Sequence, residues 1–257
     1  TDFNLSPYYD DFAESKKFHR ILFRPAFAVQ ARELTQSQTI LQNQVEKLGD
    51  HFFKNGAMII PGEIGYDLNY YAVKLTSFTD TALAGITLSD FKGLTLTGGT
   101  SGVQAVCIET EPTDGTDPNT LYVKYLKAGT DNIAQAFTSG ETITASATIN
   151  GANTTAQAVV NTTATGSAAE VQEGVYYING FHVQVAQQTI ILDKYTNTPS
   201  YRVGLTVTES FVTSSDDTSL NDNAAGSSNA NAPGAHRFKI DLTLAKKTIA
   251  STEDSNF

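Results

Sequence analysis

The amino-acid sequence predicts a mainly β protein with one long α-helix near its N-terminus, built from β-sandwich or small β-barrel modules in an elongated arrangement. Three observations predict this fold class. Several runs alternate apolar and polar residues with a period of two, which is typical of half-buried strands. The pair Asn179-Gly180 stands between two such runs and is a strong signal for a tight hairpin. Residues 32–56 instead repeat apolar residues at heptad spacing, which indicates a helix.

Residues 1–20 combine aromatic and acidic side chains without the apolar period of a helix or of a strand. Pro7 also favours an extended conformation for the residue before it. We therefore predict an extended arm, which on its own buries little surface and stays mobile. Its aromatic side chains, among them Tyr8, Tyr9 and Phe12, need a surface to cover.

Residues 21–56 are predicted to contain one long helix, which runs from about Val29 to Asn55. Gly56 is expected to end this helix, because glycine readily adopts the left-handed conformation found at helix C-termini. The helix carries a stripe at heptad spacing, with leucines at the d positions and other residues at the a positions. The stripe, called the seam from here on, consists of Leu34, Gln38, Leu41, Val45, Leu48 and Phe52.

The seam leaves two interpretations open. In the first, the helix lies on a β-sheet and the seam belongs to an ordinary core, which three heptads alone do not exclude. In the second, the seam joins the helices of a short parallel coiled coil. We expect a homotrimer in that case, although the mixed residues at the a and d positions leave a dimer open. A polar residue such as Gln38 at an a position fixes the register of a coiled coil at some cost in stability.

The remaining chain predicts two β domains. Residues 57–80 and 171–250 share strand-like runs rich in aromatic residues, and we expect them to form one discontinuous domain. Residues 81–170 differ in composition and are predicted to form a small inserted β domain. Within it, the Thr-, Ala- and Asn-rich tract at 143–169 has few large side chains to bury, so we predict a weakly packed hairpin at a sheet edge. The long loop at 213–237 indicates a function or contact with a partner.

The composition excludes several classes of function. Only 17% of the residues are charged and the formal net charge is -10, so the chain would repel a phosphate backbone and we expect no nucleic-acid partner. No run approaches the roughly 18 apolar residues of a membrane span, so we expect no membrane partner. The single cysteine, Cys107, has no partner for a disulfide and is expected to be a buried thiol.

The signals for a chemical site are weak. The four histidines lie far apart in the sequence and fit no metal-binding motif. Asp216, Asp217 and Asp222 offer the oxygen ligands that calcium prefers, but the pattern of an EF-hand is absent, so a solvated turn is favoured. The glycine-rich stretch at 97–102 lacks the lysine of a P-loop, and the serine-hydrolase motif G-x-S-x-G is absent. We therefore expect no catalytic, cofactor or metal site, and a protein that is not an enzyme.

Three stretches resemble a family of virion structural proteins of tailed phages, which is best represented in cyanophages and other marine phages. They are NLSPYYDDF at 4–12, FRPAFAVQARELTQSQTILQNQVEKLGDHFFKNG at 23–56 and SLNDNAAGSSNANAPGAHRFKIDLTL at 219–244. The resemblance covers roughly residues 4–78 and 171–245. In that family, the arm, the helix and a hairpin of the pattern G-YYINGF-V, here at 174–183, open a long tail protein that is often described as baseplate or fibre-like.

The resemblance implies a structural role in the virion. The chain would be the N-terminal part of a longer protein and would anchor a fibre or baseplate appendage to the phage tail. Its arm would dock on another tail or baseplate protein through Tyr8, Tyr9 and Phe12, and its helices would associate through the seam. The start without Met and the end shortly after a strand-like run fit the same expectation.

Two other classes of function stay open. A surface adhesin or carbohydrate-binding β module is suggested by the Thr-, Asn- and Gly-rich β region, but the absence of tryptophan weighs against stacking on sugars. A hydrolase that degrades a host polysaccharide would need two carboxylates facing each other across a cleft.

Overall fold

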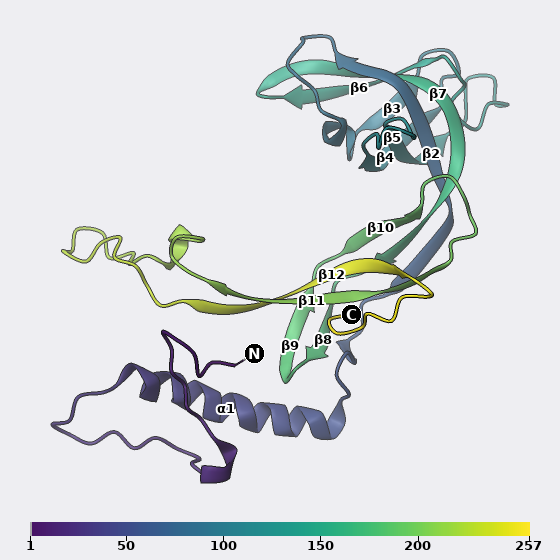
Figure 1. Ribbon diagram of the computed structural model, residues 1–257. Coiled ribbons are helices and arrows are strands. Elements are labelled where there is room, and N and C mark those ends of the chain that lie inside the picture. The colour runs from purple at the N-terminus through teal and green to yellow at the C-terminus, as the bar shows by residue number, and fades with distance from the viewer. Residues whose placement is uncertain (1) are drawn as a thin grey trace.

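The computed structural model describes residues 2–257, and its topology confirms a mainly β protein with one long helix near the N-terminus (Figure 1). The helical elements are η1 (Glu14–Lys16), α1 (Ala31–Phe52), η2 (Leu88–Phe91) and η3 (Thr218–Leu220), and the strands are β1 (Met58–Ile60), β2 (Ile64–Asp80), β3 (Thr95–Gly98), β4 (Gln104–Glu111), β5 (Thr120–Lys127), β6 (Thr142–Ile149), β7 (Ala152–Val171), β8 (Gly174–Ile178), β9 (Phe181–Val185), β10 (Gln188–Asp193), β11 (Tyr201–Val212) and β12 (Arg237–Thr248). Among residues 2–257, no helix is both long enough and apolar enough to cross a membrane.

Six strands of the described chain form a closed β-barrel, labelled at the top of Figure 1. Their order is β7-β2-β5-β4-β3-β6, and the barrel closes because β6 pairs with β7 along its whole length. Alternate residues of β7, such as Ala156, Ala158 and Val160, are fully buried in its core. The prediction of a weakly packed edge hairpin is wrong for this tract. Small side chains pack well here because the interior of a small barrel is narrow.

The strands β2 and β7 belong to both halves of the molecule. Their antiparallel ladder runs from the pair Ile64–Val171 to the pair Asp80–Ala156. The structure therefore places the division between the two halves inside β2 and β7, and not after residue 80 as predicted. No turn residue marks the place, because both strands continue through it.

The other half of the molecule consists of three layers. The helix α1 covers one face of the sheet β1-β8-β9, and the two-stranded ribbon β11–β12 covers the other face (Figure 1). Strand β10 pairs with residues 167–171 of β7, which is the end of β7 that enters this half of the molecule. Tyr176 and Ile178 of β8 point toward the ribbon and share a core with Leu242 and Leu244 of β12. This arrangement is a small sandwich with a helix on its outer side.

The predicted hairpin at Asn179-Gly180 is confirmed. Both residues have positive φ angles, 48° and 86°, as a tight two-residue turn requires, and they connect β8 to β9. The pairing of Tyr176 with Val183 follows from this turn. Tyr177, one residue later, points to the opposite face and reaches α1.

The helix is shorter than predicted. It begins at Ala31, where Gln30 and Glu33 form a reciprocal capping box, and it ends at Phe52. Phe53 already has an extended conformation, and its ring packs 5.8 Å from that of Tyr177. Gly56 adopts a left-handed conformation, but in the turn that follows the helix. Tertiary packing of Phe53 therefore decides where the helix stops.

Candidate functional site

One side of α1 packs on the β8–β9 hairpin. The hydroxyl of Tyr177 lies 2.9 Å from the carbonyl oxygen of Glu46 and 2.8 Å from a carboxylate oxygen of Asp50, and either can accept its proton. Burial and the neighbouring Asp50 raise the pKa of Tyr177 to about 12, so this hydroxyl remains a donor at neutral pH. The amide of Gln42 donates to the carbonyl of Gly180 at 2.8 Å. These contacts hold the helix on the sheet.

A second side of α1 is covered by the N-terminal arm, of which residue 1 lies outside the described residues. Thr39 donates to the carboxylate of Asp10 at 2.5 Å, and Gln36 donates to Asp11 at 2.5 Å. Asp10 is only 5% exposed, although it carries a carboxylate. The arm therefore lies against its own helix in the single chain.

The three predicted docking residues of the arm have different surroundings. The ring of Tyr8 lies 5.2 Å from that of Phe211 in β11, and its hydroxyl is 2.8 Å from Nδ1 of His236. Phe12 is half-buried, whereas Tyr9 is 59% exposed. Of the three, Tyr9 offers the most free surface to another protein.

Replacing Asp10 with alanine is expected to release the arm. The substitution removes the acceptor for Thr39 and for the backbone N–H of Phe12. Hydrogen bonds to a charged group stabilise by about 1.5–3 kcal/mol, so amide hydrogen exchange in residues 2–16 should become at least about tenfold faster. Exchange in the barrel should stay unchanged. Asp2→Ala is the control, because it removes only an exposed local acceptor for the N–H of Asn4 at 2.8 Å. Equal exchange in both variants would contradict the role of Asp10.

The third side of α1 carries the seam, and no other part of the described chain covers it. Its apolar members are all exposed, by 53% for Leu34, 68% for Leu41, 44% for Val45, 62% for Leu48 and 69% for Phe52. Gln38 is exposed in the same line. The interpretation that places the seam in a core of the same chain is therefore wrong. The residues that do pack inward from α1, Ile40 and Gly49, were not singled out from the sequence.

A second exposed surface was missed from the sequence. Residues Lys17–Gln30, called the basic segment from here on, form no helix or strand. Five large apolar side chains of this segment are more than half exposed: Phe18, Leu22, Phe23, Phe27 and Val29. A signal was present, because the chain has no acidic residue between Glu14 and Glu33, whereas the whole protein has a net charge of -10.

The groups considered for chemistry serve the fold. Within residues 2–257, no cluster of His, Cys, Asp and Glu could hold a metal ion. Asp216 accepts hydrogen bonds from the hydroxyl and the N–H of Thr213, which hold its pKa below the usual value. Asp217 caps η3 by accepting from the N–H of Ser219. Cys107 is buried as predicted, and this burial raises its pKa to about 12.

Comparison with known proteins gives one match. The family described as "Domain of unknown function (DUF4815)" matches residues 6–136 and 132–254. No curated protein and no solved structure shows a significant match.

Proposed function

Since the chain belongs to the DUF4815 family, whose description gives no function, we propose its role from its own surfaces: it is a structural protein of a phage tail or baseplate. In this proposal, α1 joins three copies of the chain through the seam, and the trimer anchors a fibre or baseplate appendage to the tail. The observation that carries the proposal is the exposure of the whole seam on a helix whose other sides are packed.

Association through the seam is physically favourable. Burying apolar side chains contributes about 25 cal/mol for each Å² removed from water, and five of the six seam residues are apolar. An isolated helix of three heptads is marginally stable. Here the hairpin and the arm already hold α1 in its helical form, so association does not have to order it. Gln38 stands at an a position, where it can select one register.

The assignment to a phage tail is supported by the resemblance in residues 4–78 and 171–245. An assembly protein also accounts for the exposed apolar side chains of α1 and of the basic segment, which would be costly on a protein that works as a monomer. The barrel and the sandwich then act as spacers and lateral contacts. The arm, through Tyr9 in particular, is the candidate contact with a neighbouring tail protein.

Sedimentation equilibrium of the chain and of a Leu41→Asp/Leu48→Asp variant tests this proposal. The unmodified chain should sediment with three times the mass of one chain. Two aspartates in each seam would place six charges at a helix interface, so the variant should be monomeric. Since both leucines are exposed in the single chain, the variant should keep the circular dichroism spectrum of a folded protein.

Leu83→Asp is the matched control, because Leu83 is 84% exposed in the turn that follows β2 and lies far from the seam in the sequence. It should leave the trimer intact. A monomer for the unmodified chain at all concentrations would contradict the assembly proposal. The location in the virion is tested separately with antibodies against the barrel, which should label phage tails in electron micrographs.

A further inference from the structure

The sandwich lacks cover on one side, because its ribbon is narrower than the sheet beneath it. Strand β12 contacts β9 and β10, and β11 lies beside β12 toward the middle of the sheet. Beyond β11, the sheet continues into β1 and β2. Residues opposite each other in a ladder point to the same face, so Met58 shares the face of Tyr176, and Ile64 shares the face of Val171. This is the face that the ribbon covers elsewhere.

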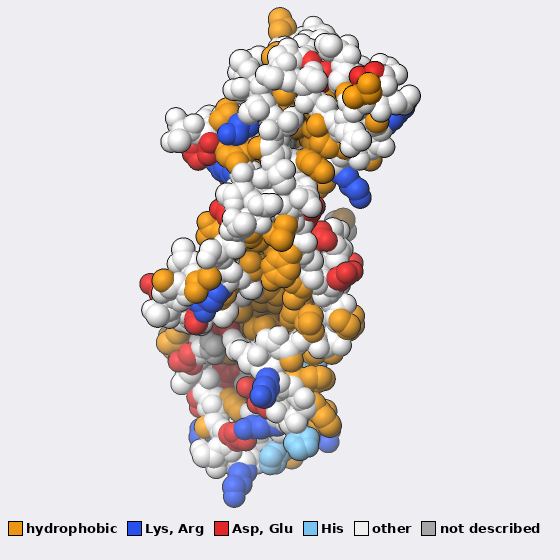
Figure 2. All heavy atoms as spheres, turned by 90° about the vertical axis from the view of Figure 1, so that its right-hand side faces the viewer, with side chains coloured by type: hydrophobic (Ala, Val, Ile, Leu, Met, Phe, Trp, Pro, Cys, Tyr) orange, Lys and Arg blue, Asp and Glu red, His pale blue; other side chains and the backbone are white. Residues whose placement is uncertain are grey.

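The uncovered part of this face is apolar. Exposure reaches 47% for Met58, 50% for Ile64, 62% for Tyr66 and 46% for Leu68, and the last three alternate along β2. These four side chains are called the apolar band from here on. Figure 2 shows a patch of hydrophobic side chains at mid-height of the molecule. A third ribbon strand beside β11 would cover this band.

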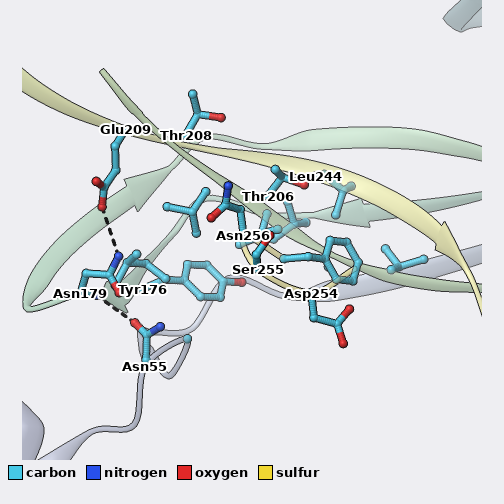
Figure 3. A pocket seen from close by; sticks show the side chains of 18 of the residues that line it. Asn55, Tyr176, Asn179, Thr206, Thr208, Glu209, Leu244, Asp254, Ser255 and Asn256 are labelled. Carbon is cyan, nitrogen blue, oxygen red and sulfur yellow. Dashed lines mark hydrogen bonds between the residues drawn. The ribbon is translucent and has the colours of Figure 1, made fainter. Parts of the chain in front are cut away.

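A groove of about 880 Å³ lies where that strand is missing (Figure 3). Its walls include every residue of β11 from Val203 to Glu209, together with Ile64 and Tyr176. The N–H of Val207 donates to the carbonyl of Asn256 at 2.8 Å, which is the one backbone bond that the described chain gives to this edge of β11. Backbone groups alternate between the two edges of a strand, so Leu205 presents its N–H and C=O to the same edge. An added strand would find a row of partners there.

The C-terminal residues 254–257 cover the groove only in part. Tyr176 is 5% exposed, and its hydroxyl has no hydrogen-bond partner within the described residues. Figure 3 shows this side chain extending toward Asp254 and Ser255. A buried hydroxyl without a partner is costly, which indicates that the site is incomplete in the single chain.

We propose that the groove binds the basic segment of a second copy of this chain as an added β-strand. The stretch 18–23 of that segment has no backbone hydrogen bond in the described chain and exposes several large apolar side chains. Its charge also suits the groove. The segment carries Lys17, Arg20 and Arg24 with no acidic residue, whereas the charged residues that line the groove, Glu209 and Asp254, are both acidic.

The placement of the basic segment favours a second copy as its source. The groove is lined by Asn55 and Gly56, just after the C-terminal end of α1, whereas the basic segment ends at Gln30, the N-cap of α1 (Figure 1). These ends are about 33 Å apart for a helix of 22 residues. The other end of the segment follows η1, where Glu14 pairs with Lys47 of α1 at 3.2 Å. Between these two ends the segment loops out beyond the N-terminal half of α1, away from the strands that form the groove (Figure 1). The contact therefore joins copies head to tail, and it is separate from the seam.

A synthetic peptide of residues 17–30 tests the proposal. The peptide, carrying a fluorophore, is titrated into the chain, which is kept dilute so that its own segments do not compete. We expect saturable binding, weakened about tenfold or more by Ile64→Lys, which places a like charge in the groove. Leu83→Lys is the matched control and should leave the affinity unchanged. A peptide with serine at Phe18, Leu22 and Phe23 should not bind.

Two outcomes would overturn the proposal: no saturable binding to the unmodified chain, or equal weakening by Ile64→Lys and Leu83→Lys. Tyr176→Phe provides a second measurement, because it should weaken peptide binding without weakening the free fold. The Leu41→Asp/Leu48→Asp variant should bind the peptide normally. Loss of the trimer and loss of the groove contact are therefore distinguished.

Discussion

Replacing Glu141 with glutamine is expected to lower the free energy of unfolding by about 3 kcal/mol, because the change leaves buried donors without an acceptor. Glu141 is 4% exposed and stands just before β6. Its carboxylate accepts from the N–H of Thr138 at 2.6 Å, and from the N–H and the hydroxyl of Ser101, both at 3.0 Å. Glutamine has the same shape but would turn an NH₂ group toward these donors. Urea unfolding followed by circular dichroism measures the loss.

The effect of this substitution depends on pH with a defined sign. Burial alone would raise the pKa of Glu141, but the hydrogen bonds from Ser101, Thr138 and Thr100 outweigh it and hold the pKa below the usual value. The contribution to stability is therefore complete above the unfolded pKa of about 4.3 and is lost as the pH falls through the lower folded pKa. The two proteins should differ most near neutral pH and converge in acid.

Glu109→Gln is the matched control for Glu141→Gln. Glu109 lies in the same barrel and pairs with Lys92 at 2.6 Å, but Lys92 is largely exposed. Ion pairs of this kind contribute about 0–1 kcal/mol, so the control should change stability little. Equal losses of unfolding free energy for the two variants would contradict the role assigned to the buried carboxylate of Glu141.

Replacing Gly49 with alanine is expected to destabilise the protein by about 2 kcal/mol, although the same change in an ordinary helix stabilises it by up to about 1 kcal/mol. A Cβ atom at Gly49 would lie 2.5 Å from Cε2 and 2.6 Å from the hydroxyl oxygen of Tyr177. That ring is 1% exposed and is fixed by its contacts with Glu46 and Asp50, so it has little room to move. Thermal and urea unfolding of the two proteins show directly whether the substitution raises or lowers stability.

A double-mutant cycle identifies the cause. Tyr177→Phe removes one of the atoms in the clash, so its cost and that of Gly49→Ala should add to more than the cost of the double variant. Strict additivity would mean that the two residues do not oppose each other across the interface.

The parts of the fold that depend on local sequence could be predicted. Asn179-Gly180 specifies its own turn, and the alternation of Phe238, Ile240 and Leu242 specifies a strand with one buried side. The heptad spacing of the seam predicts a helix with one apolar face. It does not say whether that face meets the same chain or another one, and only the exposure of the seam in the folded chain separates these cases.

The rest depends on contacts between distant segments. An alanine in the sequence predicts burial only weakly. Ala156 and Ala158 are buried because β6 and β7 close a narrow barrel. Gly49 has meaning only against Tyr177, which is 128 positions away in the chain. The groove beside β11 exists because the ribbon β11–β12 is narrower than the sheet beneath it, and no local residue pattern encodes that difference in width.

The shared strands β2 and β7 have a mechanical consequence. A load that pulls the barrel away from the sandwich runs along their ladder, from Ile64–Val171 to Asp80–Ala156. Because each strand continues through both halves, such a load pulls on two covalent backbones at once. The barrel is thus joined to the sandwich by two paired strands and not by a single linker, and a torque on it is transmitted to the sheet that carries α1.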